Sequence, residues 1–257
     1  MQKYELVSII TPTYNCGEFI AKTIDCVLAQ TYQNWEMLIV DDCSSDNTKG
    51  IVARYSDPRI KYHCLSSNSG AAIARNTALK MAKGRWIAFL DSDDLWNPTK
   101  LEKQINFMED NGYTFSYHKY DEIDENGKLL GKVLSGPKHI NHLGMISYCW
   151  PGCLTVMYDA SKVGLIQITD IKKNNDYAMW LKISKKTSCH LMPLVLAHYR
   201  KRKGSISNTN YSSLIKWHYR LFKDAESYSC VCAALCTANN LIWGAFKKIF
   251  YSSANKS

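Results

Sequence analysis

Short apolar runs alternate with segments of helical periodicity through the first hundred residues. The runs are five or six residues long, which is the length of a strand buried on both faces. This alternation predicts an α/β fold in which a mainly parallel sheet carries helices on both faces. We expect strands at Leu6–Ile10, Trp35–Val40, Ile60–Leu65 and Trp86–Leu90, with helices at about 19–30, 48–55 and 71–82.

The pattern is less regular beyond residue 98. A helix is expected from Lys100 to about Glu109, a strand at Cys153–Tyr158 and a helix beginning at Asp176. From Tyr211 to about Tyr251 the chain is predicted to be helical, with aromatic residues set among lysines and arginines. We therefore divide the chain into residues 1–98, residues 99–207 of the same domain, and a C-terminal helical segment, 208–257.

Acidic residues follow two of the expected strands. Asp41 and Asp42 end the second strand, and Asp91, Ser92, Asp93 and Asp94 follow the fourth. Three carboxylates within four residues repel one another unless a cation, a donor-rich ligand or water takes up their charge. Because parallel strands end at one edge of a sheet, the two acidic segments predict a divalent cation holding a phosphorylated ligand. The alternative is a solvated acidic turn that caps a helix.

Composition and charge narrow the class of protein. The formal charge of +9 favours anionic partners, such as nucleotides or phospholipid headgroups. We expect no signal peptide, because the first residues lead directly into a strand, and no apolar run is long enough to span a membrane. Ten cysteines without a secretory signal suit reduced thiols in a cytosol. Charge alone would also suit a non-enzymatic membrane or nucleic-acid binder, but it gives no reason for acids at strand ends.

Six segments in order resemble the inverting family 2 glycosyltransferases of the GT-A fold, of the type that builds bacterial surface polysaccharides. This resemblance implies a nucleotide-sugar donor, most often with UDP, and a glycan acceptor. It places donor binding in residues 1–98 and the acceptor and catalytic base in residues 99–207. The matching segments are Ser8–Asn15 (SIITPTYN), Val40–Thr48 (VDDCSSDNT), Asn68–Asn76 (NSGAAIARN), Phe89–Asp94 (FLDSDD), Asn175-Asp176 ahead of Trp180, and Tyr199-Arg200 through Ser207.

The resemblance assigns donor contacts to the loops after the first, second and third strands. Pro12 and Tyr14 would pack against the uracil, with the Tyr14 ring offering a flat face. Asp42 would accept the uracil N3–H, whereas Asp41 would contact the ribose, support the loop or cap a helix. Arg75 would pair with the D-x-D carboxylates or the phosphates, or form a structural salt bridge.

The D-x-D of the resemblance is Asp91-Ser92-Asp93. Asp93 would ligate Mg²⁺ or Mn²⁺ bridging the two phosphates, and Asp91 would contact the ribose or a bound water. Asp94 is expected to cap the next helix. Arg202 stands where the family often has a histidine, and it is our choice for the diphosphate over Arg200 and Lys203, although the sequence does not separate the three.

The catalytic base of the resemblance is Asp176, the second residue of the family's Glu-Asp pair. The first position here is Asn175, which removes a neighbouring charge that would raise the pKa of the base. Asp176 would take the proton from the acceptor hydroxyl, so that one displacement inverts the anomeric centre. Its alternative role is an N-cap for the following helix, and one residue can do both.

Acceptor contacts are the least determined part. Trp150, Gly152 and Cys153 are the expected wall of the acceptor site. The acceptor of such enzymes is a glycan or a polyprenyl-diphosphate sugar, which predicts a cytoplasmic enzyme at the inner face of the membrane. The basic, aromatic C-terminal segment would contact that membrane, or pack on the domain with a solvated basic face. A nucleotidyltransferase of Rossmann-like fold is the alternative function, and we expect no nucleic-acid partner.

Overall fold

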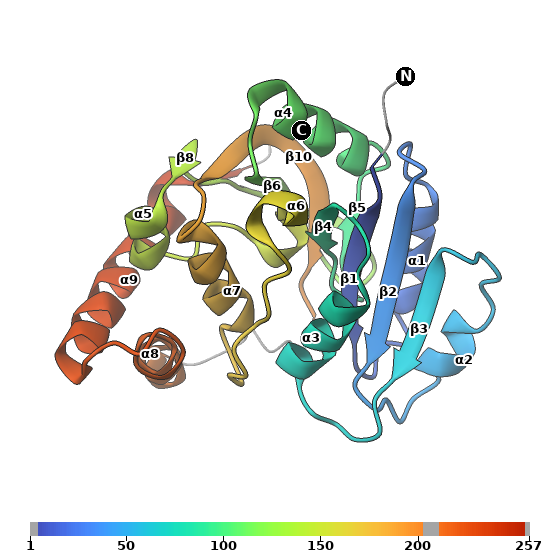
Figure 1. Cartoon of the computed structure of the whole chain (residues 1–257), viewed down its shortest axis with the longest axis horizontal. Helices are drawn as coiled ribbons and strands as arrows, with labels where there is room; N and C mark the ends of the chain where they lie inside the picture. Colours follow the sequence, from blue (N-terminus) through green and yellow to red (C-terminus); the bar gives the residue numbers. More distant parts are fainter. Residues whose placement is uncertain (1–4, 203–210, 255–257) are drawn as a thin grey trace.

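The computed structural model describes residues 5–202 and 211–254 (Figure 1). Its sheet has the order β11-β7-β6-β9-β4-β1-β2-β3. The strands β4, β1, β2 and β3 are parallel, so their carboxyl ends meet at one edge. These strands are β1 (Val7–Thr13), β2 (Trp35–Asp41), β3 (Ile60–Cys64) and β4 (Trp86–Phe89).

Both faces of this parallel region are buried, each under its own helices. Ile10, Leu38 and Ile87 pack with α3 (Ala71–Met81) on one face. Val7, Ile9 and the alternate residues of β2 pack with α1 (Ile20–Leu28), α2 (Thr48–Val52) and α4 (Lys100–Asn111) on the other. Neighbouring residues of β1, β2 and β4 therefore enter different cores, which explains why these strands are mostly apolar, whereas the edge strand β3 is only partly buried and carries Lys61 and His63.

The second half of the chain completes the sheet mostly with antiparallel pairs. β9 joins β4 to β6, and β7 and β11 extend the sheet beyond β6. β10 lies parallel to β6 and ends beside the D-x-D segment. The remaining elements are β5 (Leu95–Trp96), β6 (Phe115–Ile123), β7 (Leu129–Leu134), β8 (His139–Ile140), α5 (His142–Ser147), β9 (Met157–Asp159), α6 (Ala160–Val163), α7 (Asn175–Ser184), β10 (Cys189–Arg200) and β11 (Ser252–Ala254).

The first strand is longer than the sequence predicts. We expected a loop from Thr11, but β1 continues to Thr13 and Pro12 pairs with Val40 of β2. The carbonyls of Leu6 and Ile10 accept hydrogen bonds from the backbone nitrogens of Trp86 and Leu90, on the β4 side of β1. Every second residue of a strand points its backbone groups to the same side, so the nitrogen of Pro12 also faces β4. β4 has already ended there, at Phe89, and a missing N–H therefore breaks no ladder bond.

The expected strand at Cys153–Tyr158 is wrong in its first half. Residues Cys153–Thr155 form a 3₁₀ turn, and only Met157–Asp159 form strand β9. The turn is closed locally, because both the backbone nitrogen and the hydroxyl of Thr155 donate to the carbonyl of Gly152, at 2.9 and 2.7 Å. A threonine that bonds its own neighbouring backbone competes with the sheet, and the apolar pattern does not reveal this.

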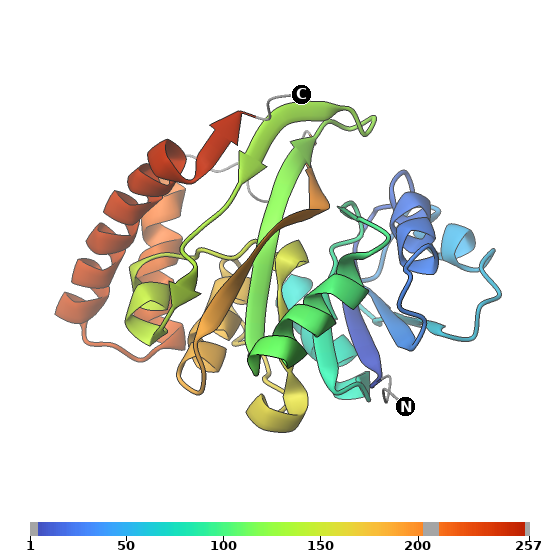
Figure 2. The ribbon, with the colours of Figure 1, turned by 90° about the horizontal axis from the view of Figure 1, so that it is seen from above.

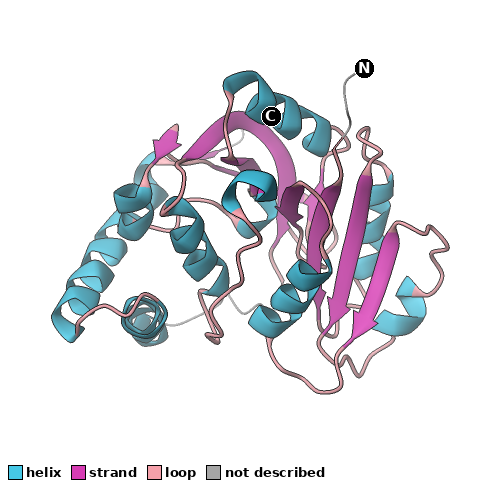
Figure 3. Ribbon diagram, in the orientation of Figure 1, coloured by secondary structure: helices cyan, strands magenta, loops and turns pink. Residues whose placement is uncertain are grey.

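The C-terminal segment is mainly helical, as predicted; it is divided into two helices (Figure 3), and a short strand follows them. Helix α8 (Tyr211–Arg220) runs on as a π-helical turn, Leu221–Ala225, and α9 (Cys230–Phe250) follows a reversal. Ser227 takes φ 58° in that reversal, and the Ser229 hydroxyl caps α9 by accepting from the Cys232 nitrogen. Figure 2 shows α8 and α9 at the opposite end of the molecule from α1 and α2.

None of the helices in the described ranges 5–202 and 211–254 combines the length and the apolar content that crossing a bilayer requires.

Candidate active site

Charged side chains from both halves of the chain meet at the carboxyl edge of the parallel strands. Asp91 and Asp93 follow β4, Arg75 lies in α3, Asp176 lies in the first turn of α7, and Arg202 follows β10. We call these five residues the charged cluster. Hydrogen bonds and electrostatic contacts connect all five. Asp41 and Asp42 have other partners, so a single ligand shared by the acidic segments after β2 and β4 stays a prediction.

Arg75 joins the D-x-D segment to the start of α7. Its guanidinium is buried, donates to a carboxylate oxygen of Asp91, and donates to the side-chain oxygen of Asn175 at 2.6 Å. Burial lowers the pKa of the Arg75 guanidinium, but the neighbouring groups Asp91, Cys153 and Asp176 raise it by more. Asn175 is thus a neutral acceptor for Arg75, where the family pattern has a second acid.

Asp93 faces the other cation of the cluster. Its Oδ2 accepts from Nε of Arg202 at 2.6 Å, and the Asp93 side chain is only 18% exposed. Burial raises the pKa of the Asp93 carboxyl, the charge of Asp91 adds to this, and Arg202 opposes it without cancelling it. A cation placed beside Asp93 would therefore favour its ionised form.

Side chains of α1 and of the loop before it donate hydrogen bonds to the backbone of the D-x-D segment. The Thr23 hydroxyl lies 3.0 Å from the carbonyls of both Ser92 and Asp94, and the thiol of Cys16 lies 3.3 Å from the Ser92 carbonyl. Ser92 thus serves this site through its carbonyl, while its contact with a nucleotide sugar stays a prediction. Neither Thr23 nor Cys16 was predicted; the signal for Thr23 was a hydroxyl on the apolar face of an amphipathic helix.

Asp94 does not cap the next helix, contrary to our expectation. It is buried, and its Oδ1 accepts from the backbone nitrogen of Arg200 at 2.9 Å, whereas α4 begins after Thr99. Burial and the charges of Asp93 and Asp91 raise the pKa of Asp94 well above its usual range. Leu95–Trp96 follow Asp94 and pair with β10, so they separate Asp94 from the start of α4. The Asp94 carboxylate holds the end of β10 instead.

Arg200 is a structural residue. Its fully buried side chain donates to the Asp93 carbonyl at 2.8 Å and to the carbonyls of Asp124 and Glu125 at 3.1 and 2.8 Å. Lys201 pairs with Glu122 at 3.3 Å, whereas the side chain of Arg202 pairs with a carboxylate of the D-x-D segment, and its contact with a diphosphate stays a prediction. Lys203 lies outside the described residues.

The loop after β1 presents Tyr14 to solvent. Tyr14 is 48% exposed, next to buried Pro12 and Thr13. Asn15 adopts φ 46°, and its side-chain oxygen accepts from the Ser45 nitrogen at 2.8 Å, which fixes this loop to the one after β2. An exposed ring on a fixed loop is suited to stacking on a base, and the roles of Pro12 and Tyr14 stay predictions.

Asp41 and Asp42 are both buried and hold loops in place. Asp41 accepts from the nitrogen and hydroxyl of Ser44 and from the hydroxyl of Tyr62. Asp42 accepts from the nitrogens of Ser69 and Gly70, at 2.6 and 2.8 Å, and so fixes the start of α3, which carries Arg75. Loop support was one of the alternatives for Asp41; for Asp42 it stands beside the predicted uracil contact, which stays a prediction.

Asp176 lies in the first turn of α7, where its Oδ1 accepts from the Tyr177 nitrogen at 2.8 Å. Burial raises the pKa of the Asp176 carboxyl, Arg75 lowers it in part, and Asp91 raises it further. The missing acid at position 175 therefore does not leave Asp176 with an ordinary pKa. A carboxylate with a raised pKa, partly open to solvent, is suited to accepting a proton.

The three residues expected at the acceptor wall lie in different surroundings. Cys153 is within electrostatic reach of Asp91, Arg75 and Asp176, and burial first of all raises its thiol pKa well above the usual value. Gly152 lies against the Tyr120 ring, where an added Cβ would be 3.0 Å from the ring. Trp150 is instead buried between α5 and α9, with its indole nitrogen donating to the Gly144 carbonyl.

The residues of the charged cluster fit a divalent cation that a substrate helps to hold. Within residues 5–202 and 211–254, no group of three or more His, Cys, Asp or Glu side chains is placed to hold a metal alone. Asp91 and Asp93 nevertheless offer hard carboxylate oxygens, each beside an arginine that a substrate phosphate could also contact. Mg²⁺ and Mn²⁺ are commonly held by one or two carboxylates together with substrate phosphates and water.

Comparison with known proteins agrees with this geometry. The family model described as glycosyl transferase family 2 matches residues 8–157. The chain is 45% identical to the Escherichia coli UDP-Glc:alpha-D-GlcNAc-diphosphoundecaprenol beta-1,3-glucosyltransferase WfaP, over 82% of this chain and 84% of WfaP. It is 40% identical to the putative teichuronic acid biosynthesis glycosyltransferase TuaG of Bacillus subtilis, over 90% of this chain and 92% of TuaG.

A solved structure shows the same fold. The crystal structure of S. aureus TarS 1-349 in complex with UDP-GlcNAc superposes with a TM-score of 0.73 at 22% identity, covering 92% of this chain and 71% of that one. The α/β sheet flanked by helices is thus the GT-A fold that the sequence predicted.

Proposed function

The chain belongs to glycosyl transferase family 2, and we propose that it transfers a sugar from a UDP-sugar to a hydroxyl group of a lipid-linked glycan, with inversion at the anomeric carbon. The observation that carries this proposal is the bridge made by Arg75. Because Arg75 contacts both Asp91 and Asn175, a donor-side carboxylate and the candidate base Asp176 belong to one charged cluster.

The donor site is proposed at the carboxyl edge of the parallel strands. The exposed ring of Tyr14 would stack on the uracil, and the diphosphate would lie between Arg202 and the D-x-D segment. Support comes from the TarS complex, which contains UDP-GlcNAc on the same fold. UDP-glucose is the first donor to test, since WfaP is named for that donor.

Asp93, with Asp91 beside it, would hold Mn²⁺ or Mg²⁺ against the diphosphate. When bound, the divalent cation supplies positive charge to the leaving UDP. Asp93 is paired with Arg202 in the structure, so a cation at Asp93 would free the guanidinium of Arg202 for a phosphate oxygen. Arg202 would then stabilise the same developing charge without depending on pH.

Asp176 is the proposed general base. As the acceptor oxygen forms its bond to C1 of the donor sugar, the bond from C1 to the phosphate oxygen breaks and the hydroxyl proton passes to the Asp176 carboxylate. The raised pKa of Asp176, which burial causes in the first place, increases its basicity. Arg75 would keep the base and Asp91 at a fixed separation through its contacts with Asn175 and Asp91.

The proposed acceptor is a polyprenyl-diphosphate sugar of an O-antigen or capsule repeat unit, with Cys153 and Gly152 on its side of the site. WfaP, whose name specifies GlcNAc-diphosphoundecaprenol as acceptor, supports this class. An enzyme that extends such an acceptor before export works at the inner face of the cytoplasmic membrane, where we place this one.

The test is a donor screen on a synthetic GlcNAc-diphosphate-lipid with Mn²⁺ or Mg²⁺ present. UDP release is measured for a panel of UDP-sugars, the product mass is read by mass spectrometry, and the new anomeric configuration by NMR. We expect one UDP-hexose to give a single-sugar extension with an inverted linkage. Absence of product with every UDP-sugar, or a retained configuration, would show that the proposal is wrong.

A further inference from the structure

Helix α9 is amphipathic in the reverse of the usual sense. The buried side chains that it turns toward the domain are Ala233, Thr237, Asn240 and Lys247, and the partly buried Cys236 and Trp243 also pack on the core. Large apolar side chains at spacings of three, four or seven residues lie on the outer face: Val231 (69% exposed), Leu235 (65%), Ile242 (68%), Phe246 (36%), Ile249 (71%) and Phe250 (65%). We call these six residues the apolar face. A helix packed on a soluble domain normally buries its apolar stripe.

The orientation of α9 is fixed by specific polar contacts on its inner side. Asn240 donates to the Tyr177 hydroxyl at 2.8 Å, and the Lys247 ammonium donates to the Trp150 carbonyl at 2.8 Å. Gly244 lies so close to the Tyr148 ring that an added Cβ would be 3.0 Å from it. Turning the apolar face inward would break these buried bonds and leave their polar atoms unpaired. The alternative predicted from the sequence was a helix packed on the domain with a solvated basic face. Helix α9 does pack on the domain, but its solvated face carries large apolar side chains.

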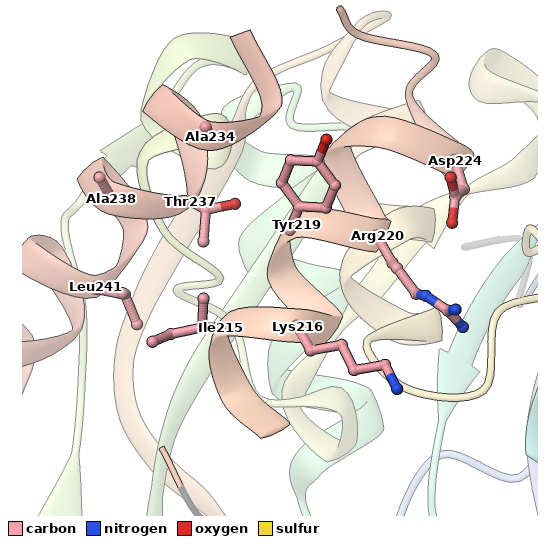
Figure 4. Close-up of a pocket in the computed structure, with 9 residues that line it drawn as sticks. All are labelled: Ile215, Lys216, Tyr219, Arg220, Asp224, Ala234, Thr237, Ala238 and Leu241. Carbon is pink, nitrogen blue, oxygen red and sulfur yellow. The ribbon is translucent and has the colours of Figure 1, made fainter. Parts of the chain in front are cut away.

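Helix α8 adds a hollow and two cations beside the apolar face. Figure 4 shows Lys216 and Arg220 on α8, next to a hollow of about 560 Å³ that Ile215 lines from α8 and Ala234 and Leu241 line from α9. Both cations lie near the Trp217 ring, with Arg220 at 5.4 Å and Lys216 at 5.9 Å from its centroid. Tryptophan flanked by basic residues is typical of the water–lipid interface.

The two cations do not belong to the charged cluster. His218 is buried and its ring lies 6.3 Å from that of Tyr177, on the α7 side of the helix. Lys216 and Arg220 are each two residues from His218, so they point to roughly the opposite side of α8. They are therefore available for an anionic partner other than the nucleotide sugar.

Charge decides between a bilayer and a second copy of the chain. Helix α9 contains no acidic residue, Lys248 lies exposed next to Ile249 of the apolar face, and Asp224, an acid that lines the hollow, is outnumbered by Lys216 and Arg220. A twofold dimer formed through this face would gather the cations of both copies in one interface, where like charges repel. Anionic phospholipid complements both the apolar face and its cationic surroundings.

We propose that the apolar face of α9, together with Lys216 and Arg220 of α8, is a docking surface for a bilayer that contains anionic phospholipid. Helix α9 lies in the plane of the interface with its apolar face among the acyl chains, and the two cations contact headgroup phosphates. This inference rests on the proposed function in one respect: an enzyme with a lipid-linked acceptor must work at the membrane. Binding of the protein to lipid is measured independently of sugar transfer.

The test is sedimentation of the full chain with vesicles at 0.1 M salt. Vesicles of phosphatidylcholine with 30% phosphatidylglycerol are compared with phosphatidylcholine alone. We expect binding to the anionic vesicles, weakened at least tenfold by L235N/I242N/I249N and severalfold by K216E/R220E. The matched control is L165N/L194N, which removes two half-exposed leucines outside α8 and α9 and is expected to bind like the parent.

Two further measurements separate the outcomes. Transfer to a short-chain, water-soluble acceptor is expected to be equal in the parent and the α9 variant, and its failure in the parent would count against the proposed function alone. Equal vesicle binding by the parent and L235N/I242N/I249N would overturn the docking surface. So would a dimer in lipid-free solution that this variant dissociates, because the apolar face would then belong to a second copy.

Discussion

Replacing Arg75 by Gln is expected to shift the acid limb of the pH–rate profile to higher pH. Arg75 is the cation that offsets burial at Asp176, so its removal raises the pKa of Asp176 further. A unit charge within roughly 4–6 Å of a carboxylate contributes about 3–4 kcal/mol at an effective dielectric constant of 20, or about 2–3 pKa units. Because Asp176 is partly exposed, we halve this to a shift of about one unit.

The sign follows from the role of the base. Asp176 must be ionised to accept a proton, and a higher pKa keeps it protonated to a higher pH. Below the midpoint, kcat/KM at a fixed pH falls about tenfold for a one-unit shift. The assay is UDP release between pH 5 and 9, with folding checked by circular dichroism, because leaving Asp91 without its buried partner costs about 3 kcal/mol of stability.

The matched control is Arg85→Gln. Arg85 pairs with Asp159 at 2.9 Å, at the amino end of β4 and therefore at the opposite edge of the sheet from the charged cluster. This variant is expected to lose stability without moving the acid limb. An unshifted limb in Arg75→Gln, or an equal shift in Arg85→Gln, would refute the electrostatic link between Arg75 and the base.

Four further substitutions test other parts of the site and the fold. Asp176→Asn is expected to lower kcat about a thousandfold and to leave UDP affinity, measured by calorimetry, within about threefold, so weakened UDP binding would contradict its role as base. Asp93→Ala is expected to abolish the dependence of UDP affinity on Mn²⁺, and an unchanged metal dependence would place the cation elsewhere. Thr23→Val removes the hydroxyl beneath the D-x-D segment; we expect a loss of about 1–2 kcal/mol in urea unfolding together with weaker donor binding, and normal binding would show that the segment holds itself. Burial lowers the pKa of Lys247 from 10.5 to about 8, so between these pH values the unfolded state binds one more proton than the folded state. The free energy of unfolding therefore rises with pH in this range, by up to about 1.4 kcal/mol per pH unit. Lys247→Met is expected to remove that part of the rise, and identical pH slopes in the two proteins would contradict the assignment.

The parallel half of the fold was predictable from the sequence because it is doubly buried. The strands β1, β2 and β4 are buried on both faces, α1 shows amphipathic spacing and α3 is rich in alanine, whereas the edge strand β3 is only partly buried. The acidic segments could be placed at one edge of the sheet because the carboxyl ends of parallel strands all lie at the same edge. The turn at Cys153–Thr155 depends instead on the Thr155 hydroxyl, which donates to the nearby Gly152 carbonyl. The extension of β1 through Pro12 depends on where the neighbouring strand β4 ends.

The charged cluster was predictable as residue types at strand ends, but its connections were not. That Arg75 would reach Asn175 depends on how α3 and α7 pack, over a separation of 100 residues. Asp94 was misassigned because a short acid before a helix has the pattern of a cap, whereas its partner, the nitrogen of Arg200, lies 106 residues later. Sequence periodicity carries no information on contacts of that range.

The long separation between Asp93 and Arg202 has a consequence for synthesis on the ribosome. The D-x-D segment is paired with residues that are 107 and 109 positions later in the chain. At about 5–20 residues per second, it waits roughly 5 to 20 seconds after translation before Arg200 and Arg202 are made. A nascent chain that stops short of residue 200 has the parallel strands but lacks both of these partners, so the charged cluster is completed only after Arg202 has been made.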